Sequence, residues 1–586
     1  MRQWMVAAKK ADFYAIAEKF HVDPVVARII RNREVIGEEN IRIYLGGNLS
    51  DLSDPHQMKD MDRLVEILAQ KIRKQVHIRI IGDYDVDGVT SSHLFLTALR
   101  RVGAKVDVVI PHRIQDGYGL SLHLLQQAKE DGVDTILTCD NGIAAIDEIA
   151  WAKAQKMTVL VTDHHAVPFE EHEGRRTEKK SLADAVVNPH QQDCGYPYKE
   201  LCGAGVAWNV IRVLYENYDM DKREAEDLLD FVAMATVCDV MSLTGENRIL
   251  VKEGLKRIRH TKNIGLQALM QACNVQPENI SAYHFGYVLG PCVNATGRLD
   301  TARHALRLFE TGQETEAEEI ARDLVDLNQE RKELTLQGVE MAKKLCEEGG
   351  YENDPVLVLF LPDVHESIAG LIAGRIREMY NRPVFVLTRG EEGVKGSGRS
   401  TENYSMYENM CGCAELFTKF GGHPMAAGLS LPEENVEKFR RKINENCPLT
   451  VEEVCPDIHI DMAMPVGYAS TELVHQFALL EPFGKDNPSP LFADRNLSIS
   501  RMWLIGKNRN VLRMSVLSEY GQPVPVIFFG DVETLFAYFT EKFGQKEVEN
   551  ALHGRKNRIL FSMVYTAKID FYQGNENLQL EMKYYR

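Results

Sequence analysis

The residues with the clearest chemical potential are three aspartates that alternate along one short turn, residues 82–88. Asp83, Asp85 and Asp87 stand two positions apart, so three like charges lie close together. Such crowding is costly unless a cation lies among the carboxylates, and hard divalent ions such as Mg²⁺ and Mn²⁺ prefer carboxylate oxygen. Taken alone, the turn is equally consistent with a solvated acidic loop or a single calcium site.

Further candidate metal ligands occur later in the chain. Asp140 follows the apolar run 135–139, Asp163-His164-His165 follows the run 158–162, and Asp239 ends an amphipathic segment at 224–237. The three aspartates of the turn supply, with Asp140, Asp239, His164 and His165, five carboxylates and two imidazoles. These are enough to hold two divalent ions that share one carboxylate. Two ions about 3.5–4 Å apart can support in-line displacement at phosphorus and activate a water molecule. Mixed imidazole and carboxylate ligands favour Mn²⁺ somewhat over Mg²⁺.

The elements that must position these residues are predicted by alternating strand and helix patterns between residues 76 and 188. The expected strands are 78–81, 105–110, 135–139 and 158–162, and the expected helices are 91–102, 120–129 and 144–155. This alternation predicts an α/β fold with a doubly wound parallel sheet, which binds ligands beyond the carboxyl ends of its strands. The acidic motifs follow the first, third and fourth strands. We therefore expect them at one edge of the sheet.

The rest of the chain predicts three further parts. Residues 301–349 are helical and highly charged, which is typical of a solvated connector. A second α/β unit follows, with expected strands at 356–361 and 383–387 around a helix at 367–379. After Cys455, alternating strands at 497–505, 511–516, 524–529 and 578–584 suggest a small β-barrel. The expected domains are 1–300, with an N-terminal extension at 1–70, then 301–349, 350–452 and 453–586.

Composition limits the class of protein. Among 586 residues, 85 acids and 68 bases give a net charge of −17, which argues against a protein that coats nucleic acid unless its bases gather in one channel. The 11 cysteines include no CxxC pair, so a reducing cytoplasm is expected. No apolar run is long enough for a membrane span, and the first ten residues have no signal-peptide core.

The ordered motifs resemble those of the DHH phosphoesterase superfamily, and within it the RecJ family of single-strand-specific exonucleases. The metal-binding motifs are residues 82–88, Asp140-Asn141-Gly142, Asp163-His164-His165 and Asp239. The resemblance runs from about residue 30 to the end and includes residues 110–113, 117–119, 294–298, 365–370, 396–400, 421–428 and 481–484. The sequence departs from the family at 485–488, where an acid stands in place of the usual glycine.

The resemblance implies a site built from two divalent cations, Mn²⁺ or Mg²⁺. One would be held by Asp83, Asp85 and Asp140, and the other by Asp87, Asp140, His164 and Asp239. His165 would lie close to the scissile phosphate, so His165, Asp140 and Asp85 are the implied catalytic residues. The implied substrate-binding residues are Arg298, Ser397 and Arg399 at a 5′-terminal phosphate, Arg113 at the backbone, and His423. Taken alone, 396–400 is typical of a flexible surface loop, and His423 of a tight turn.

The implied activity is metal-dependent hydrolysis of single-stranded DNA from its 5′ end to mononucleotides, in repair and recombination. The barrel at 453–586 resembles an oligonucleotide-binding fold, with basic residues at 507–509 and 555–558 and with aromatic side chains at Trp503, Phe528, Phe529 and Tyr584. Single-strand-binding protein and a repair helicase are the implied partners. Two alternatives stay open. A phosphoesterase for short oligonucleotides, cyclic dinucleotides or pyrophosphate is disfavoured by the long chain, and a non-catalytic replication scaffold by the complete carboxylate set.

Overall fold

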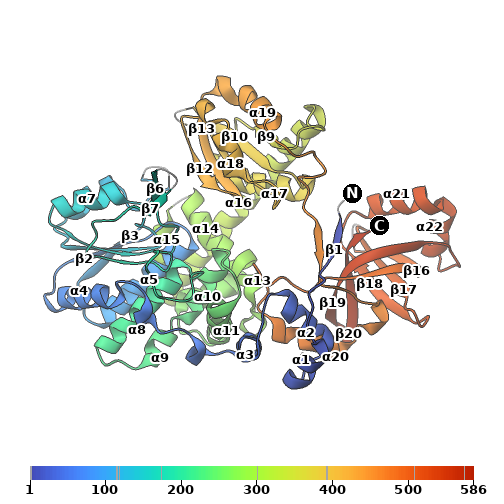
Figure 1. Cartoon of the computed structure of the whole chain (residues 1–586), viewed down its shortest axis with the longest axis horizontal. Helices are drawn as coiled ribbons and strands as arrows, with labels where there is room; N and C mark the ends of the chain where they lie inside the picture. Colours follow the sequence, from blue (N-terminus) through green and yellow to red (C-terminus); the bar gives the residue numbers. More distant parts are fainter. Residues whose placement is uncertain are drawn as a thin grey trace. The chain divides into compact units, whose positions relative to one another are not determined.

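The computed structural model describes residues 3–113, 116–117, 119–172, 175–299, 301–390, 393–506, 509–572 and 574–586. The chain forms two compact units (Figure 1). The first comprises residues 48–456, and the second combines residues 3–47 with residues 457–586. Across the described ranges, no helix is both long and apolar enough to span a bilayer.

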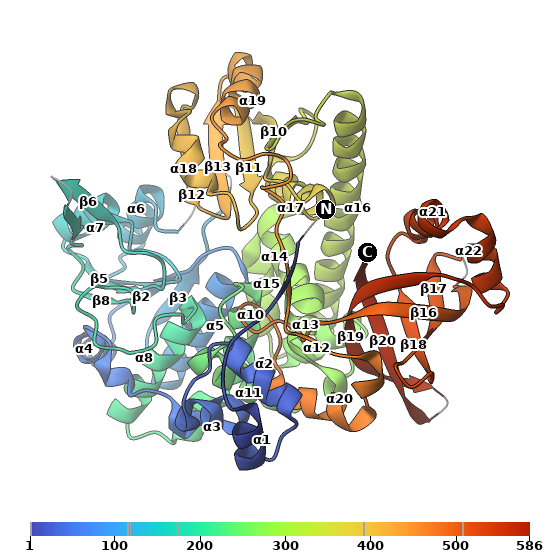
Figure 2. The same cartoon turned by 45° about the vertical axis from the view of Figure 1, so that its right-hand side comes forward.

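The first unit begins with a five-stranded parallel sheet in the order β3-β2-β4-β5-β8. Its strands are β2 (Ile78–Ile81), β3 (Val106–Val109), β4 (Thr135–Cys139), β5 (Thr158–Thr162) and β8 (Ala185–Val187). Alternate side chains point to opposite faces, so Ile80 and Leu137 join one core cluster whereas Ile81 and Ile136 join another. Helices α4 (Met61–Arg73), α5 (Val86–Arg101) and α8 (Gly203–Asn217) cover the first face, and α6 (Leu122–Glu130) and α7 (Ile146–Ala154) the second (Figures 1 and 2).

Strands β2, β4 and β5 have the bounds predicted from the sequence, and the predicted α/β class is confirmed. Helix α5 starts at Val86, five residues before the predicted start, because the Asp85 side chain accepts the Gly88 N–H at 3.0 Å and caps it. The acidic turn is therefore the beginning of a helix. The short strand β8 and the hairpin of β6 (Phe169–His172) and β7 (Arg175–Glu178) were not predicted.

A helical layer follows the sheet. The expected helix at 224–237 is two helices, α9 (Lys222–Glu226) and α10 (Leu229–Cys238). The next elements are α11 (Gly245–Ile258), α12 (Ile264–Ala272), α13 (Ala282–His284), the π-helical turn η4 (Phe285–Leu289), α14 (Gly290–Leu299) and α15 (Ala302–Glu310). The long helix α16 (Glu314–Glu348) joins this layer to the second sheet. It is more than a solvated connector, because Ala317, Leu324 and Val339 are buried against its neighbours.

The second sheet of this unit has the order β12-β13-β11-β10-β9, with only β9 and β10 parallel. Its strands are β9 (Leu357–Phe360), β10 (Val384–Gly390), β11 (Gly393–Arg399), β12 (Lys419–His423) and β13 (Ala426–Leu431). Helices α16 and α17 (Ala369–Tyr380) pack on one face, and α18 (Met406–Cys411) and α19 (Val436–Glu445) on the other.

The loop interpretation of residues 396–400 is wrong, because 396–399 belong to the central strand β11. Its glycines serve close packing rather than flexibility. A Cβ atom on Gly396 would lie 2.3 Å from Leu387 Cδ2, and one on Gly398 would lie 2.3 Å from Met406 Sδ. Larger residues would force these neighbours apart, so the sheet itself requires the glycine-rich composition.

The second unit contains a β-barrel in the strand order β15-β16-β17-β18-β20-β19, which β16 and β19 close by pairing. The strands are β15 (Met462–Ala463), β16 (Phe492–Ile505), β17 (Val511–Leu517), β18 (Pro523–Phe528), β19 (Leu560–Tyr572) and β20 (Asn575–Tyr585). Helices α20 (Thr471–Phe477), α21 (Val532–Phe543) and α22 (Gln545–Leu552) accompany them. The sequence did not predict β19 or the last two helices.

The N-terminal segment belongs to the barrel unit, so the expected extension of the catalytic domain over residues 1–70 is wrong for residues 3–47. Helices α1 (Phe13–Phe20), α2 (Pro24–Asn32) and α3 (Glu38–Gly46) share the barrel's core through Val26 and Ile30. A buried Arg33–Asp461 ion pair at 2.7 Å and the parallel pairing of β1 (Trp4–Val6) with β14 (Ile458–Ile460) strengthen this attachment.

The family departure at 485–488 has a local explanation. Asp486 adopts a positive φ of 59°, the conformation in which glycine is usually preferred. The turn forms nonetheless, because the buried Asn487 amide donates to the carbonyls of Leu480 and Pro482.

Candidate metal centre and phosphate pocket

The acidic turn at the end of β2 is tightly anchored. Asp87 is 1% exposed, and its carboxylate accepts the N–H groups of Gly203 at 2.6 Å and Ala204 at 2.7 Å, at the start of α8. The positive end of that helix therefore stabilises the charge on Asp87. A Cβ on Gly88 would lie 2.4 Å from the Asp83 carbonyl oxygen, so glycine is needed where α5 passes under the turn.

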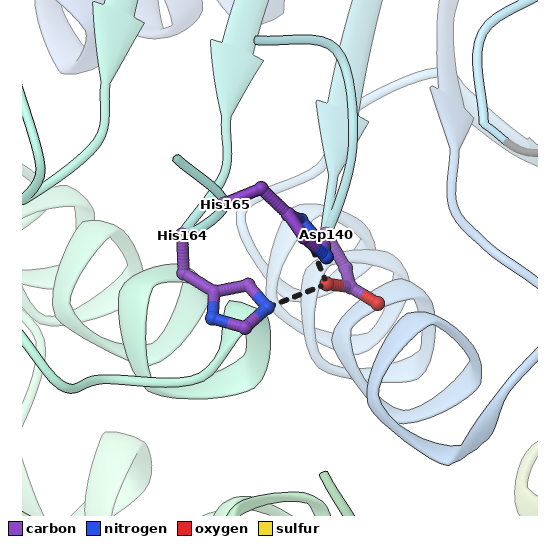
Figure 3. A group of neighbouring side chains, drawn as sticks. All are labelled: Asp140, His164 and His165. Carbon is purple, nitrogen blue, oxygen red and sulfur yellow. Dashed lines mark ion pairs between the residues drawn. The ribbon is translucent and has the colours of Figure 1, made fainter. Parts of the chain in front are cut away.

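Asp140 follows β4 in a left-handed conformation with φ of 60°. The neighbouring Asn141 amide donates to the carbonyls of Ile81 and Cys139, at 3.0 and 2.9 Å, and so ties the ends of β2 and β4 together. Oδ1 of Asp140 lies 3.1 Å from Nε2 of His164 and 3.9 Å from Nδ1 of His165 (Figure 3). The carboxylate thus meets both histidines that follow β5.

His164 connects Asp140 to the remaining predicted ligands. Its Nε2 atom lies 3.6 Å from Oδ2 of Asp87 and 3.6 Å from Oδ2 of Asp239, the residue that follows α10. In the part of the chain that the structure describes, ligand atoms within 4.8 Å of one another form three groups, which are Asp83–Asp85–Asp140, Asp87–His164–Asp239 and Asp140–His164–His165. All six predicted metal ligands are therefore brought together at the carboxyl edge of the sheet.

The chemistry of this centre fits divalent cations. Both carboxylate oxygens of Asp83 are buried, and no side-chain donor among the described residues bonds to them. Burial and then the charge of Asp85 raise the pKa of Asp83 well above its usual value, and burial together with the neighbouring aspartates does the same for Asp140. Charged carboxylates are thus costly here without a cation. The group Asp83–Asp85–Asp140 suits one ion, and the group Asp87–His164–Asp239 together with Asp140 suits another.

Asp163 has a role that the sequence did not assign to it. It is 1% exposed, and its Oδ1 atom accepts a hydrogen bond from Nδ1 of His165 at 2.8 Å. Burial opposes ionisation of Asp163, but the bond and charge of His165 hold its pKa below the usual value. Burial lowers the pKa of His165, but the bond and charge of Asp163, together with the charges of Asp239 and Asp87, raise it to about 9. The presence of an aspartate two positions before His165 was the signal in the sequence that could have indicated this role.

A second feature of the same unit is a cavity of about 530 Å³ between the two sheets. Arg113 and Arg298 line it from one side, and Lys395, Arg399 and Lys419 from the other. Among the described lining residues only Glu366 is acidic, and it pairs with Lys395 at 2.8 Å. The cavity therefore carries excess positive charge that suits an anion with more than one negative charge.

Short contacts hold the guanidinium groups in place. Arg298 donates to the Ser367 carbonyl at 2.6 Å, and Arg399 donates to Ser397 Oγ at 3.2 Å. Burial, with the nearby charges of Arg113, Arg331 and Arg399, lowers the pKa of Arg298 to about 10. Three arginines crowded into a half-buried space are electrostatically unfavourable until an anion binds between them.

Four of the five predicted substrate-binding residues, Arg113, Arg298, Ser397 and Arg399, line this cavity. His423 is exposed at the end of β12 outside the lining set, and its contact with substrate stays a prediction. Sequence reasoning missed Tyr84, whose ring lies 5.0 Å from the Arg113 guanidinium. It also missed Gly370, where a Cβ would lie 2.7 Å from Ser397 Oγ. Residues 118, 507 and 508, which belong to predicted motifs, lie outside the described residues.

Comparison with known proteins agrees with this geometry. The family descriptions "DHH family, N-terminal domain", "DHHA1 domain" and "RecJ OB domain" match residues 77–236, 353–447 and 460–584. A Haemophilus influenzae protein named single-stranded-DNA-specific exonuclease RecJ is 32% identical over 582 residues, which are 96% of each chain. The chain belongs to the RecJ family.

RecJ of Bacillus subtilis is 33% identical over 512 residues, or 87% of this chain, and the match spans 63% of that longer protein. A crystal structure of RecJ in complex with Mn²⁺ from Thermus thermophilus aligns with a TM-score of 0.81 at 25% identity, over 100% of this chain and 79% of that one. A crystal structure of exonuclease RecJ bound to manganese aligns with a TM-score of 0.56 at 32% identity. This alignment covers 66% of this chain and 94% of that one. The shared RecJ fold thus extends over both units.

Proposed function

We propose that this RecJ-family chain is a metal-dependent exonuclease that hydrolyses single-stranded DNA from the 5′ end to 5′-mononucleotides. One observation carries the proposal, the presence in one unit of a carboxylate–histidine centre suited to two cations and a cavity lined by three arginines. The names of its relatives support the substrate class, and the manganese in the two RecJ structures supports the metal.

Each predicted site residue has a task in this proposal. Asp83, Asp85 and Asp140 hold one Mn²⁺ or Mg²⁺, and Asp87, Asp140, His164 and Asp239 hold the other. When bound, such a pair activates water and neutralises charge on the phosphate. His165, positioned by Asp163, donates a hydrogen bond to the scissile phosphate and so stabilises its developing charge.

The arginine cavity explains the direction of cleavage. A terminal phosphate carries close to two charges at neutral pH, whereas an internal phosphodiester carries one, so several guanidiniums favour the end of a strand. Arg298, Arg399 and Ser397 bind that 5′-phosphate, Arg113 contacts the backbone, and His423 adds an outer contact. On the resemblance alone, the barrel binds DNA, and single-strand-binding protein and a repair helicase are partners in repair and recombination in the cytoplasm.

Digestion of end-labelled strands tests the proposal. A 5′-labelled single strand should release labelled mononucleotide at once, whereas a 3′-labelled strand should shorten gradually. Both reactions should require Mn²⁺ or Mg²⁺ and should stop in chelator or on duplex DNA. Product that appears first from the 3′ label would overturn the direction, and full activity in chelator would overturn the metal centre. Faster turnover of a dinucleotide than of a long strand would instead favour a small-substrate phosphoesterase.

A further inference from the structure

Two exposed tyrosines lie on the same helical ridge as Arg298. Elements α13, η4 and α14 follow one another without a break from residue 282 to residue 299. Along them Tyr283, Tyr287, Asn294 and Arg298 recur at spacings of four, seven and four residues, which places them on one face. With about 1.5 Å of rise per residue, Tyr287 lies roughly 16 Å along the ridge from Arg298.

The two tyrosine rings form a ready-made aromatic surface. Their centroids lie 5.1 Å apart with an interplanar angle of 23°, so the rings are stacked. Tyr283 is 62% exposed and Tyr287 is 71% exposed, so neither ring serves the core. The turn that carries Tyr287 is π-helical, a conformation that frequently marks functional sites.

The ridge is attached directly to the metal centre. The Phe285 carbonyl accepts a hydrogen bond from Cys238 Sγ at 3.3 Å, next to the predicted ligand Asp239. Oδ1 of Asn294 accepts the Val86 N–H at 3.1 Å, between Asp85 and Asp87. The ridge therefore passes the arginine cavity at Arg298, then the acidic turn at Asn294, and then reaches the tyrosine pair.

We propose that Tyr283 and Tyr287 form a base-stacking platform that positions single-stranded DNA on the 3′ side of the scissile bond. The inference rests on the proposed function, because it needs the 5′-phosphate in the arginine cavity. About five nucleotides at the 3.4 Å stacked spacing cover the separation of roughly 16 Å, and fewer suffice for an extended strand. Every base has an aromatic face, so stacking suits an enzyme that must accept any sequence.

The direct test places a fluorescent base at defined positions along a strand. A 5′-phosphorylated strand carries one 2-aminopurine at position 2, 3, 4, 5 or 8, and binding is measured in chelator so that nothing is cut. In the wild type, fluorescence should be quenched at about positions 3–5. The variant Y283A/Y287A should lose this quenching and bind about 10- to 100-fold more weakly. The control Y283F/Y287F, which keeps both rings, should behave as the wild type.

A kinetic comparison separates positioning from structural damage. On a 20-nucleotide strand, Y283A/Y287A should raise KM about 10- to 100-fold with kcat retained, whereas a dinucleotide too short to reach the platform should be cut as by the wild type. If the alanine variant still degrades strands and its quenching and KM are unchanged, the stacking platform is overturned but the proposed function is not. Equal losses on both substrates would show structural damage and also reject it. A wild type that neither binds nor cuts single strands would overturn the proposed function as well.

Discussion

Asp163 fixes the orientation of His165 through a hydrogen bond of 2.8 Å between Oδ1 and Nδ1. The same oxygen accepts the backbone N–H groups of His164 and His165, and Oδ2 accepts the Ile143 N–H at 2.9 Å. The carboxylate is therefore held from several directions and cannot turn toward a metal without breaking these bonds. With Nδ1 of His165 engaged by Asp163, Nε2 is the ring nitrogen that would donate to substrate in the proposed function. Asp163 is a positioning residue.

Asp163→Asn should lower kcat about 10- to 100-fold without changing the number of Mn²⁺ ions bound. The amide oxygen can still accept the N–H groups of His164 and His165, but the amide NH₂ cannot accept the Ile143 N–H, and the charge that stabilises protonated His165 is lost. In a double-mutant cycle, Asp163→Asn should add little to His165→Ala, because both changes remove the same oriented imidazole. The control Asp193→Asn removes an exposed acid paired with Lys59 and should leave kcat unchanged. Additive losses in the cycle would contradict the positioning role.

Asp140→Ala should disrupt both metal sites at once, because Asp140 belongs to the Asp83–Asp85–Asp140 group and its Oδ1 atom lies 3.1 Å from Nε2 of His164, a ligand of the other proposed site. Titration of metal-free wild type with Mn²⁺ should show two ions and a rise in Tm, since saturation at 100 times Kd stabilises a site by about 2.7 kcal/mol. The variant should bind fewer ions and lose most of this rise. Asp131→Ala, which removes a partner of Arg79 away from the metal centre, is the matched control. Wild-type stoichiometry in Asp140→Ala would disprove the shared ligand.

The clustering of the predicted metal ligands could be foreseen because of a simple rule of parallel sheets. Asp83, Asp140 and His164 each follow an apolar strand, and the carboxyl ends of parallel strands meet at one edge. Their common location in the fold could therefore be inferred from local sequence patterns. The role of Asp163 could not be inferred in this way, because it depends on which carboxylate oxygen faces His165 and on the backbone N–H groups that hold the carboxylate.

Features that join distant parts of the chain were harder to predict. The arginine cavity depends on the register of β11, and a glycine-rich stretch looks like a loop until its neighbouring strands are known. The N-terminal helices join the barrel through contacts such as Arg33 to Asp461, which lie 428 positions apart. No local pattern in the sequence indicates a contact between residues so far apart. Hydrophobic periodicity specifies which face of α2 is buried, but not which unit buries it.

Arg399→Ala should remove most of the preference for a 5′-phosphorylated strand over a 5′-hydroxyl strand. A charge-assisted hydrogen bond contributes about 1.5–3 kcal/mol, so KM for the phosphorylated strand should rise about 10- to 100-fold. KM for the 5′-hydroxyl strand should change little. Arg389→Ala is the control, because Arg389 lies in the same sheet but pairs with Glu433 outside the cavity. Equal effects of Arg399→Ala on both strands would rule out a terminal-phosphate contact.

Asp230 should make the first unit less stable as the pH rises. It is 3% exposed on α10, and burial raises its pKa to about 6, although Thr261 Oγ and the Phe231 N–H both donate to it. Between its ordinary value near 3.8 and about 6, the folded chain holds this proton while the unfolded chain loses it. The free energy of unfolding therefore falls with rising pH over this window, by on the order of 3 kcal/mol in total.

Asp230→Asn abolishes this titration while an amide can still accept from Phe231 and bond to Thr261. The variant should therefore have nearly the wild-type Tm at pH 4 and a higher Tm at pH 7, and the difference should level off above about pH 7 because wild-type Asp230 is by then ionised. Thermal unfolding at half-unit pH steps measures the difference directly. Asp227→Asn, at a position whose side chain is 58% exposed, should show no comparable trend and serves as the control. A difference in Tm that stays constant from pH 4 to pH 7 would show that burial of the charge is not the cause.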